Sequence, residues 1–108
     1  MRADPFYSPF APLWLGLAHY MLENYGDALP PTLESLARSP NARGPHQQLA
    51  MTYAQMGRKE DARAEAAEVL RVEPGYTIER VSRANRFKDP RDADHFFGGL
   101  RKAGLPER

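Results

Sequence analysis

The sequence predicts an all-α protein built from consecutive pairs of antiparallel helices. The first observation is an internal repeat, in which residues recur 34 positions later. The repeated pairs are Leu15 and Leu49, Ala28 and Ala62, Leu36 and Leu70, and Pro40 and Pro74. The second observation is that apolar residues within each repeat follow the three- and four-residue spacing of an amphipathic helix. A repeat of this length holds two helices that cannot bury their apolar faces alone, so neighbouring pairs stack.

The composition favours a single domain and excludes several classes of partner. A chain of 108 residues supports one modest core. Its net charge of +1, from 15 basic and 14 acidic residues, gives no overall field for nucleic acid or anionic lipid. The absence of cysteine excludes disulfides and thiolate metal sites, and it fits a cytoplasmic protein. The most apolar stretch, residues 6–22, is too short and too interrupted to span a membrane, and no secretory signal precedes it.

The first repeat is expected over about residues 9–41. Its first helix should cover about 9–22 and the second should follow the turn at 24–26. Residues predicted to form the packing face of the first helix are Leu15, Gly16, His19 and Leu22. Asp27 is the expected N-cap of the second helix, and Pro30 and Pro31 should delay or distort its start.

The second repeat is expected over about residues 42–75. Pro45 should open its first helix and Gly57 should end it, while the second helix should cover about 59–72. Residues predicted to face inward are His46, Leu49, Ala50, Tyr53 and Met56 from the first helix, and Ala62, Ala66, Val69 and Leu70 from the second.

A degenerate third helix and a capping helix are expected over about residues 77–104. Thr77 should cap the third helix, at about 78–86, and Asp89 with Pro90 should start the last one. Residues of its apolar stripe are Ala93, Phe96, Phe97, Leu100 and Ala103. Gly99, at the edge of this stripe, predicts a close backbone contact, and the helix is expected to cover the open end of the stack.

Both repeats resemble tetratricopeptide repeats residue by residue. Positions matching the family pattern are Leu15, Gly16, His19, Ala28, Ser35 and Pro40 in the first unit, and Leu49, Ala50, Tyr53, Ala62, Val69 and Pro74 in the second. His19 departs from the usual Tyr, and Pro12 and His46 stand where Trp is usual. The resemblance implies a short right-handed superhelical stack whose concave groove binds a protein or peptide.

A narrower resemblance covers about residues 4–107. The segments DPFYSPFAPLWLGLAHYMLENYGDALPP, TYAQMGRKEDARAEAAEVLRVEPGYTIER and FKDPRDADHFFGGLRKAGLPE are similar to the C-terminal repeat region of bacterial class III adenylate/guanylate cyclases. The resemblance implies a regulatory or assembly role and not catalysis, because the cyclase domain itself has no counterpart in the chain. A stand-alone peptide-binding adaptor is the alternative.

Residues for catalysis or metal binding are sparse. The sequence holds no nucleophile elbow, no zinc-protease motif and no phosphate-binding glycine loop. Of the three histidines only His95 has a possible ligand at helical spacing, Asp92, which is better placed to complement the helix dipole. We therefore expect no enzyme activity, metal or cofactor, and a small metal-dependent hydrolase is the least favoured alternative.

The candidate binding surface is the inner face of the first helix of each repeat. Its predicted residues are Leu13, Trp14, Leu17, Tyr20, Met21, Gln47, Gln48, Met51 and Gln55. The first helix is apolar nearly all round, which is typical of a helix buried on both sides. An upstream repeat, a second copy of the chain or a peptide should cover it. We expect self-association through Trp14, most simply as a two-fold dimer.

Overall fold

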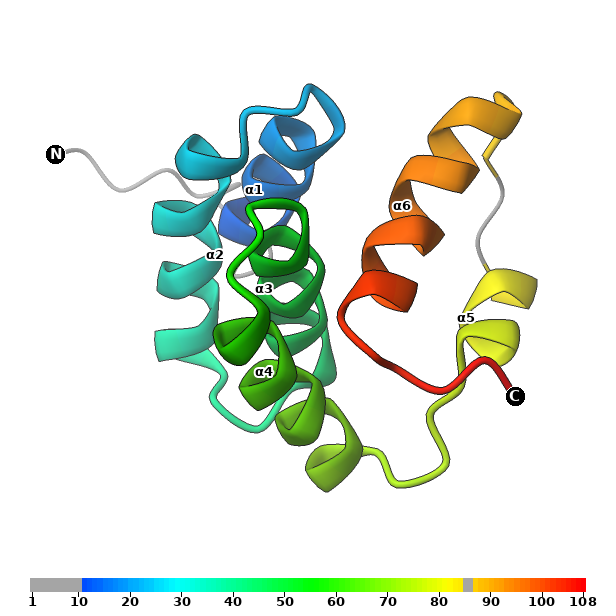
Figure 1. The fold of residues 1–108 in the computed structure, drawn as a ribbon. Coiled ribbons are helices and arrows are strands. Elements are labelled where there is room, and N and C mark those ends of the chain that lie inside the picture. Colours follow the sequence, from blue (N-terminus) through cyan, green and yellow to red (C-terminus); the bar gives the residue numbers. More distant parts are fainter. Residues whose placement is uncertain (1–10, 85–86) are drawn as a thin grey trace, which may run out of the picture.

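The computed structural model describes residues 11–84 and 87–108, and helices are the only regular elements in these ranges. The helices are α1 (Ala11–Met21), α2 (Tyr25–Arg38), α3 (Arg43–Gln55), α4 (Lys59–Val72), α5 (Ile78–Ala84) and α6 (Pro90–Lys102). Figure 1 shows α1 to α4 side by side, with α6 running along them and α5 beside the lower end of α6. The predicted all-α class is confirmed. Among the described helices, none has the length and apolar character needed to cross a bilayer.

The first four helices form two packed pairs. Helix α1 packs on α2, α3 packs on α4, and the pairs meet through α2 and α3. Buried residues of α2 recur 34 positions later as buried residues of α4; the pairs are Ala28 and Ala62, Thr32 and Ala66, and Ser35 and Val69. The second helix of each pair therefore turns an equivalent face inward.

Local capping signals are present at several helix ends. The bounds of α4 match those predicted. An Asp89 carboxylate oxygen accepts a hydrogen bond of 2.9 Å from the backbone N–H of Arg91, and Pro90 occupies the first helical position of α6. Gly57 and Gly104 follow α3 and α6 with φ values of 79° and 89°, the left-handed conformation that favours glycine after a helix.

The start of α2 was predicted incorrectly. The helix begins at Tyr25, so Asp27 lies in its first turn and is not the N-cap, while Pro30 and Pro31 lie inside it. The backbone N–H of Ala28 donates to the Asn24 carbonyl at 3.0 Å, so the helix is established before the prolines. Each proline then removes one backbone donor from an otherwise continuous helix. Helix α3 likewise begins before Pro45, at Arg43.

The packing face of α1 also differs from the prediction. Leu15 and Leu22 are 53% and 71% exposed, although both were expected to face the core. Gly16 is buried as predicted, whereas Pro12 and Tyr20 are buried in place of the two leucines. The helix is therefore oriented so that Pro12, Gly16 and Tyr20 are buried, rather than Leu15 and Leu22. At the C-cap of α3, Met56 is also exposed rather than inward-facing.

Gly16 explains this orientation. A Cβ atom on Gly16 would overlap Thr32 Oγ1 and Gln48 Nε2, and it would lie 3.2 Å from the carbonyl oxygen of Ala28. A residue without a side chain lets α1 approach both neighbouring helices closely. The close approach fixes which face of α1 is buried.

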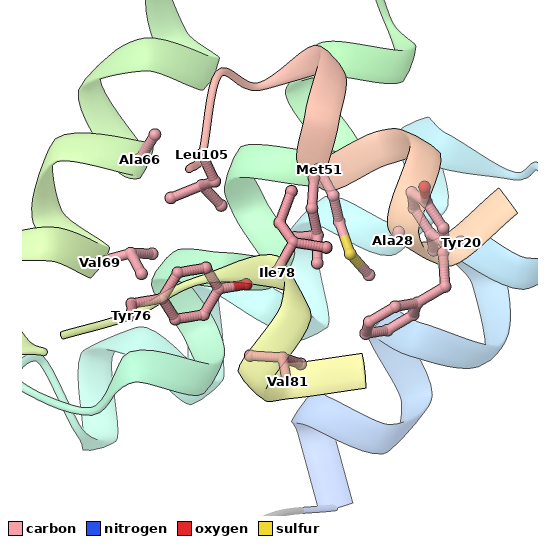
Figure 2. Close-up of a cluster of buried hydrophobic side chains, with 11 residues drawn as sticks. Tyr20, Ala28, Met51, Ala66, Val69, Tyr76, Ile78, Val81 and Leu105 are labelled. Carbon is pink, nitrogen blue, oxygen red and sulfur yellow. The ribbon is translucent and has the colours of Figure 1, made fainter. Parts of the chain in front are cut away.

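The core continues from the helix pairs into the C-terminal elements. Figure 2 shows Met51, Val69, Tyr76, Ile78 and Leu105 within one buried cluster. Helix α6 does not close the end of the stack as predicted; it lies along α3 and also contacts α1. The close contact predicted at Gly99 is confirmed, since a Cβ there would overlap the Tyr20 hydroxyl and lie 2.9 Å from Met51 Cβ.

Candidate interaction surface

Helix α1 has a second apolar face that points to solvent. The residues of this outer stripe are Trp14, Leu15, Ala18 and Leu22, and all are exposed. Trp14 is 66% exposed. Their spacing places them along one side of the helix and the turn that follows. A contiguous exposed apolar stripe of this kind is typical of an interaction surface.

The equivalent face of α3 shows what such a stripe packs against. Counterparts of Trp14, Leu15 and Ala18 at the 34-residue offset are Gln48, Leu49 and Thr52, and all three are buried. Helix α3 contacts both α1 and α2, the helices of the preceding pair. Gln48 Nε2 donates hydrogen bonds of 3.0 Å to the Leu13 carbonyl and 2.8 Å to Thr32 Oγ1. Within residues 11–84 and 87–108, α1 has no preceding pair to cover its corresponding face.

A cleft opens beside the outer stripe, between α1, α3, the segment before α6 and the middle of α6. Its volume is about 270 Å³, which suits a large apolar side chain better than a drug-sized ligand. Its lining residues are Leu13, Trp14, Leu17, Gly44, Gln47, Gln48, Phe87 and Phe96. Trp14 belongs to both features, so the stripe and the cleft form one continuous surface.

The residues predicted to bind a partner separate into two groups. Leu13, Trp14, Leu17, Gln47 and Gln48 line the cleft. The others lie nearer to α6 and the core: Tyr20 and Met51 are fully buried, and Met21 and Gln55 are partly buried. The chain itself therefore fills the part of the predicted groove around Tyr20 and Met51.

A polar network connects α6 to α1 and α3. Tyr20 Oη donates to the His95 carbonyl at 2.7 Å and accepts from Gln55 Nε2 at 3.0 Å. The His95 ring stacks on Tyr20 with centroids 4.5 Å apart, and its Nε2 lies 2.8 Å from Tyr25 Oη. Lys102 Nζ donates to Gln55 Oε1 at 2.9 Å. We call Tyr20, Tyr25, Gln55, His95 and Lys102 the tyrosine–histidine network.

Sequence reasoning missed this network because its members are far apart in the chain. Tyr20 and His95 are separated by 75 positions, and no local spacing relates them. The glycine at position 99 was the one signal that a close contact existed, but it did not identify the partner. Phe87 was likewise not predicted to line the cleft, because Leu13 and Trp14, which line it too, are distant in the chain.

Burial controls the chemistry of the network. Burial raises the pKa of Tyr20 well above the usual tyrosine value, and the hydrogen bond from Gln55 opposes this effect only in part. Burial likewise raises the pKa of Tyr25. Both phenols are therefore protonated at neutral pH, so they serve here as hydrogen-bonding groups and not as bases.

His46 links the helices of the second pair, α3 and α4, to the loop before α3. Its Nδ1 lies 2.7 Å from Glu65 Oε1 on α4, and its Nε2 lies 2.7 Å from the Pro40 carbonyl in the loop before α3. Because a carbonyl only accepts, Nε2 carries the proton in that bond. The buried imidazole therefore links three segments.

Side chains suited to metal binding do not gather in the described parts of the chain. No group of three or more His, Asp or Glu side chains occurs there in a geometry that could hold an ion. The His95 ring, considered above with Asp92 as a possible metal ligand, stacks on Tyr20 and lies within hydrogen-bond distance of Tyr25. Comparison of the chain with protein-family models, with curated proteins and with solved structures finds no match.

Proposed function

We propose that the protein is a non-catalytic protein-interaction module of tetratricopeptide type that self-associates through the outer stripe of α1. The observation that carries the proposal is the exposure of Trp14, Leu15 and Ala18, whose counterparts in α3 are buried by a preceding helix pair. A helix that is apolar on two faces is normally covered on both. A second copy of the chain supplies the protein surface that covers the outer stripe of α1.

The repeat interpretation is supported by the equivalent buried positions in α2 and α4. A degenerate repeat is recognised by conserved packing positions rather than by identity, and Thr32 with Ala66 and Ser35 with Val69 meet that criterion. The described residues hold two such pairs, whereas three repeats usually make a stable array. Association of two copies adds further packing to these pairs.

The simplest arrangement is a two-fold dimer in which the two outer stripes face each other. A two-fold axis brings the same patch from both copies together, so one stripe provides both halves of the interface. Trp14 is the largest residue of the stripe, and tryptophan is enriched among residues that dominate interface energies. Replacing such a residue by Ala typically costs about 2 kcal/mol or more of binding free energy.

Light scattering on matched variants tests this function. We expect the wild-type chain to form dimers, and Leu15→Ser to shift it towards monomer, since Leu15 lies on the stripe. Leu33→Ser is the control, because Leu33 is 44% exposed on α2, outside the stripe. Equal masses for all three proteins at every concentration would contradict the proposal.

The sequence segments that resemble cyclase C-terminal repeats suggest a class of further partner. We propose that the module serves the regulation or assembly of a nucleotide cyclase system, and the support for this is the resemblance over about residues 4–107. Titrating a purified class III cyclase catalytic domain with the module tests it. A complex is the expected result, whereas the absence of any complex favours the adaptor alternative.

A further inference from the structure

The outer stripe of α1 has a large, small, large order of side chains along one ridge of the helix. Trp14, Ala18 and Leu22 are spaced by four residues, and side chains at that spacing lie one above the other on a helix. The backbone N–H of Leu22 donates to the Ala18 carbonyl at 3.1 Å, so the helical geometry reaches Leu22 although α1 ends at Met21. The ridge therefore has a small residue at its middle and a large apolar residue about one turn to either side.

The ridge is open along its whole length in a single copy. Trp14 and Leu22 are 66% and 71% exposed, and Ala18 between them is exposed as well. Gly16, which faces Thr32 of α2 and Gln48 of α3, lies two residues before Ala18 and therefore on nearly the opposite side of the helix. The neighbouring helices of the same copy thus leave the ridge uncovered.

A ridge with this order is complementary to itself when it is reversed. If two copies cross antiparallel at Ala18, Trp14 of one copy lies opposite Leu22 of the other, because both are four residues from the crossing point. Ala18 lets the two backbones approach, and the larger side chains fill the space where the helices diverge on either side. A two-fold axis at Ala18 makes this contact twice with one set of residues.

The charges at the ends of the ridge favour the antiparallel direction. Helix α1 contains no Asp, Glu, Lys or Arg, so its first turn holds no acidic side chain, and the exposed Glu23 directly follows the ridge. An antiparallel pair places Glu23 of one copy near the first turn of α1 in the other, where the positive end of the helix dipole attracts a carboxylate. A parallel pair would instead bring two Glu23 side chains together at one end and two helix starts at the other, and both contacts would be repulsive.

We propose that two copies of the chain pair through an antiparallel contact between their α1 helices, with the two-fold axis at Ala18 and Trp14 against Leu22 on both sides of it. This inference rests on the proposed function, because it takes a second copy as the occupant of the outer stripe. It adds the direction and the register of the pairing, which the exposure of the stripe alone does not specify.

Disulfide formation in single-cysteine variants tests the register, because the chain has no cysteine of its own. Two cysteines form a disulfide only when their Cα atoms lie within about 7 Å of each other. Ala18→Cys places the thiol at the axis, so mild oxidation should convert it to a covalent dimer on a denaturing gel. Glu23→Cys is the matched control and should stay monomeric on the gel, because in an antiparallel pair the two copies of this residue are roughly 15 Å apart along the helices.

A steric variant tests the same crossing point without oxidation. Ala18→Leu enlarges the apolar stripe, yet it should weaken the dimer by about 10-fold or more, because two leucines would collide at the axis. Ala18→Ser keeps the side chain small and should dimerise as the wild type does. Because Ala18 is exposed in the single copy, both variants should unfold in urea as the wild-type monomer does.

Light scattering under reducing conditions separates this inference from the proposed function. If the wild type is dimeric, three results overturn the register alone: Ala18→Cys that stays uncrosslinked, Glu23→Cys that crosslinks, or Ala18→Leu that dimerises as tightly as the wild type. A wild-type chain that is monomeric at every concentration overturns the proposed function, and the register with it.

Discussion

Single glycines set the distances between helices in this protein. Gly16 and Gly99 lie where α1 and α6 approach their neighbours, and a Cβ at either position overlaps a side-chain atom. Gly26, by contrast, meets nothing within 4 Å. The same residue type thus has a packing role at two positions and none at the third.

Gly16→Ala should lower the free energy of unfolding by about 1–3 kcal/mol, the usual cost of overpacking, despite the better helix propensity of Ala. Gly26→Ala is the matched control and should be neutral or stabilising by up to about 1 kcal/mol. Urea unfolding followed by circular dichroism measures both. Equal stability of the two variants would show that α1 does not need its close approach to α2 and α3.

The buried tyrosines predict a loss of stability at high pH. Burial raises the pKa of Tyr20 and of Tyr76 in the folded state above the unfolded value of about 10. Their contribution is therefore fully present below pH ~10 and is lost above it, as the unfolded chain ionises first. Each residue contributes a slope of up to about 1.4 kcal/mol per pH unit.

Urea unfolding measured between about pH 8 and 11 gives the slope of unfolding free energy against pH. This range brackets the ordinary tyrosine pKa of about 10. Tyr20→Phe should reduce the slope, whatever its effect on stability at neutral pH, because Phe does not ionise. Identical slopes for the wild type and the variant would show that Tyr20 is accessible to water in the folded chain.

At the scale of the helices, local sequence determined several boundaries. Asp89 with Pro90, and the glycines at 57 and 104, act through backbone geometry that is readable in a few residues. The prolines of α2 misled the prediction because tertiary packing holds Ala28, Thr32 and Ser35 inward on both sides of them. The packing energy of these buried residues outweighed the preference of proline against a helix interior. A short window of sequence carries no information about that packing.

Pro30→Ala should therefore stabilise the protein. The substitution restores a backbone donor in the helix interior, where Pro is up to about 3 kcal/mol less favourable than Ala. The gain should be smaller, about 1–2 kcal/mol, because Pro also restricts the unfolded chain. Pro74→Ala, outside the helices, is the control and should not stabilise. A Pro30→Ala protein less stable than the wild type would mean that α2 requires the proline.

At the scale of the whole molecule, the repeat predicted the helix pairs but not the position of α6. The repeat is a property of neighbouring segments, whereas α6 reaches Tyr20, Gln55 and Met51 across most of the chain. Several of the predicted binding residues consequently lie beneath α6. The rest, around Trp14, remain on the surface and form the candidate site.

The fluorescence of Trp14, the single tryptophan of the chain, reports most directly on the outer stripe. Acrylamide quenching would be measured over a dilution series of the full chain, with sedimentation velocity on the same samples. If the stripe is an interface, quenching rises and mass falls together as dimers dissociate. A monomer at the highest concentration, with Trp14 equally quenched throughout the series, would contradict self-association through this surface.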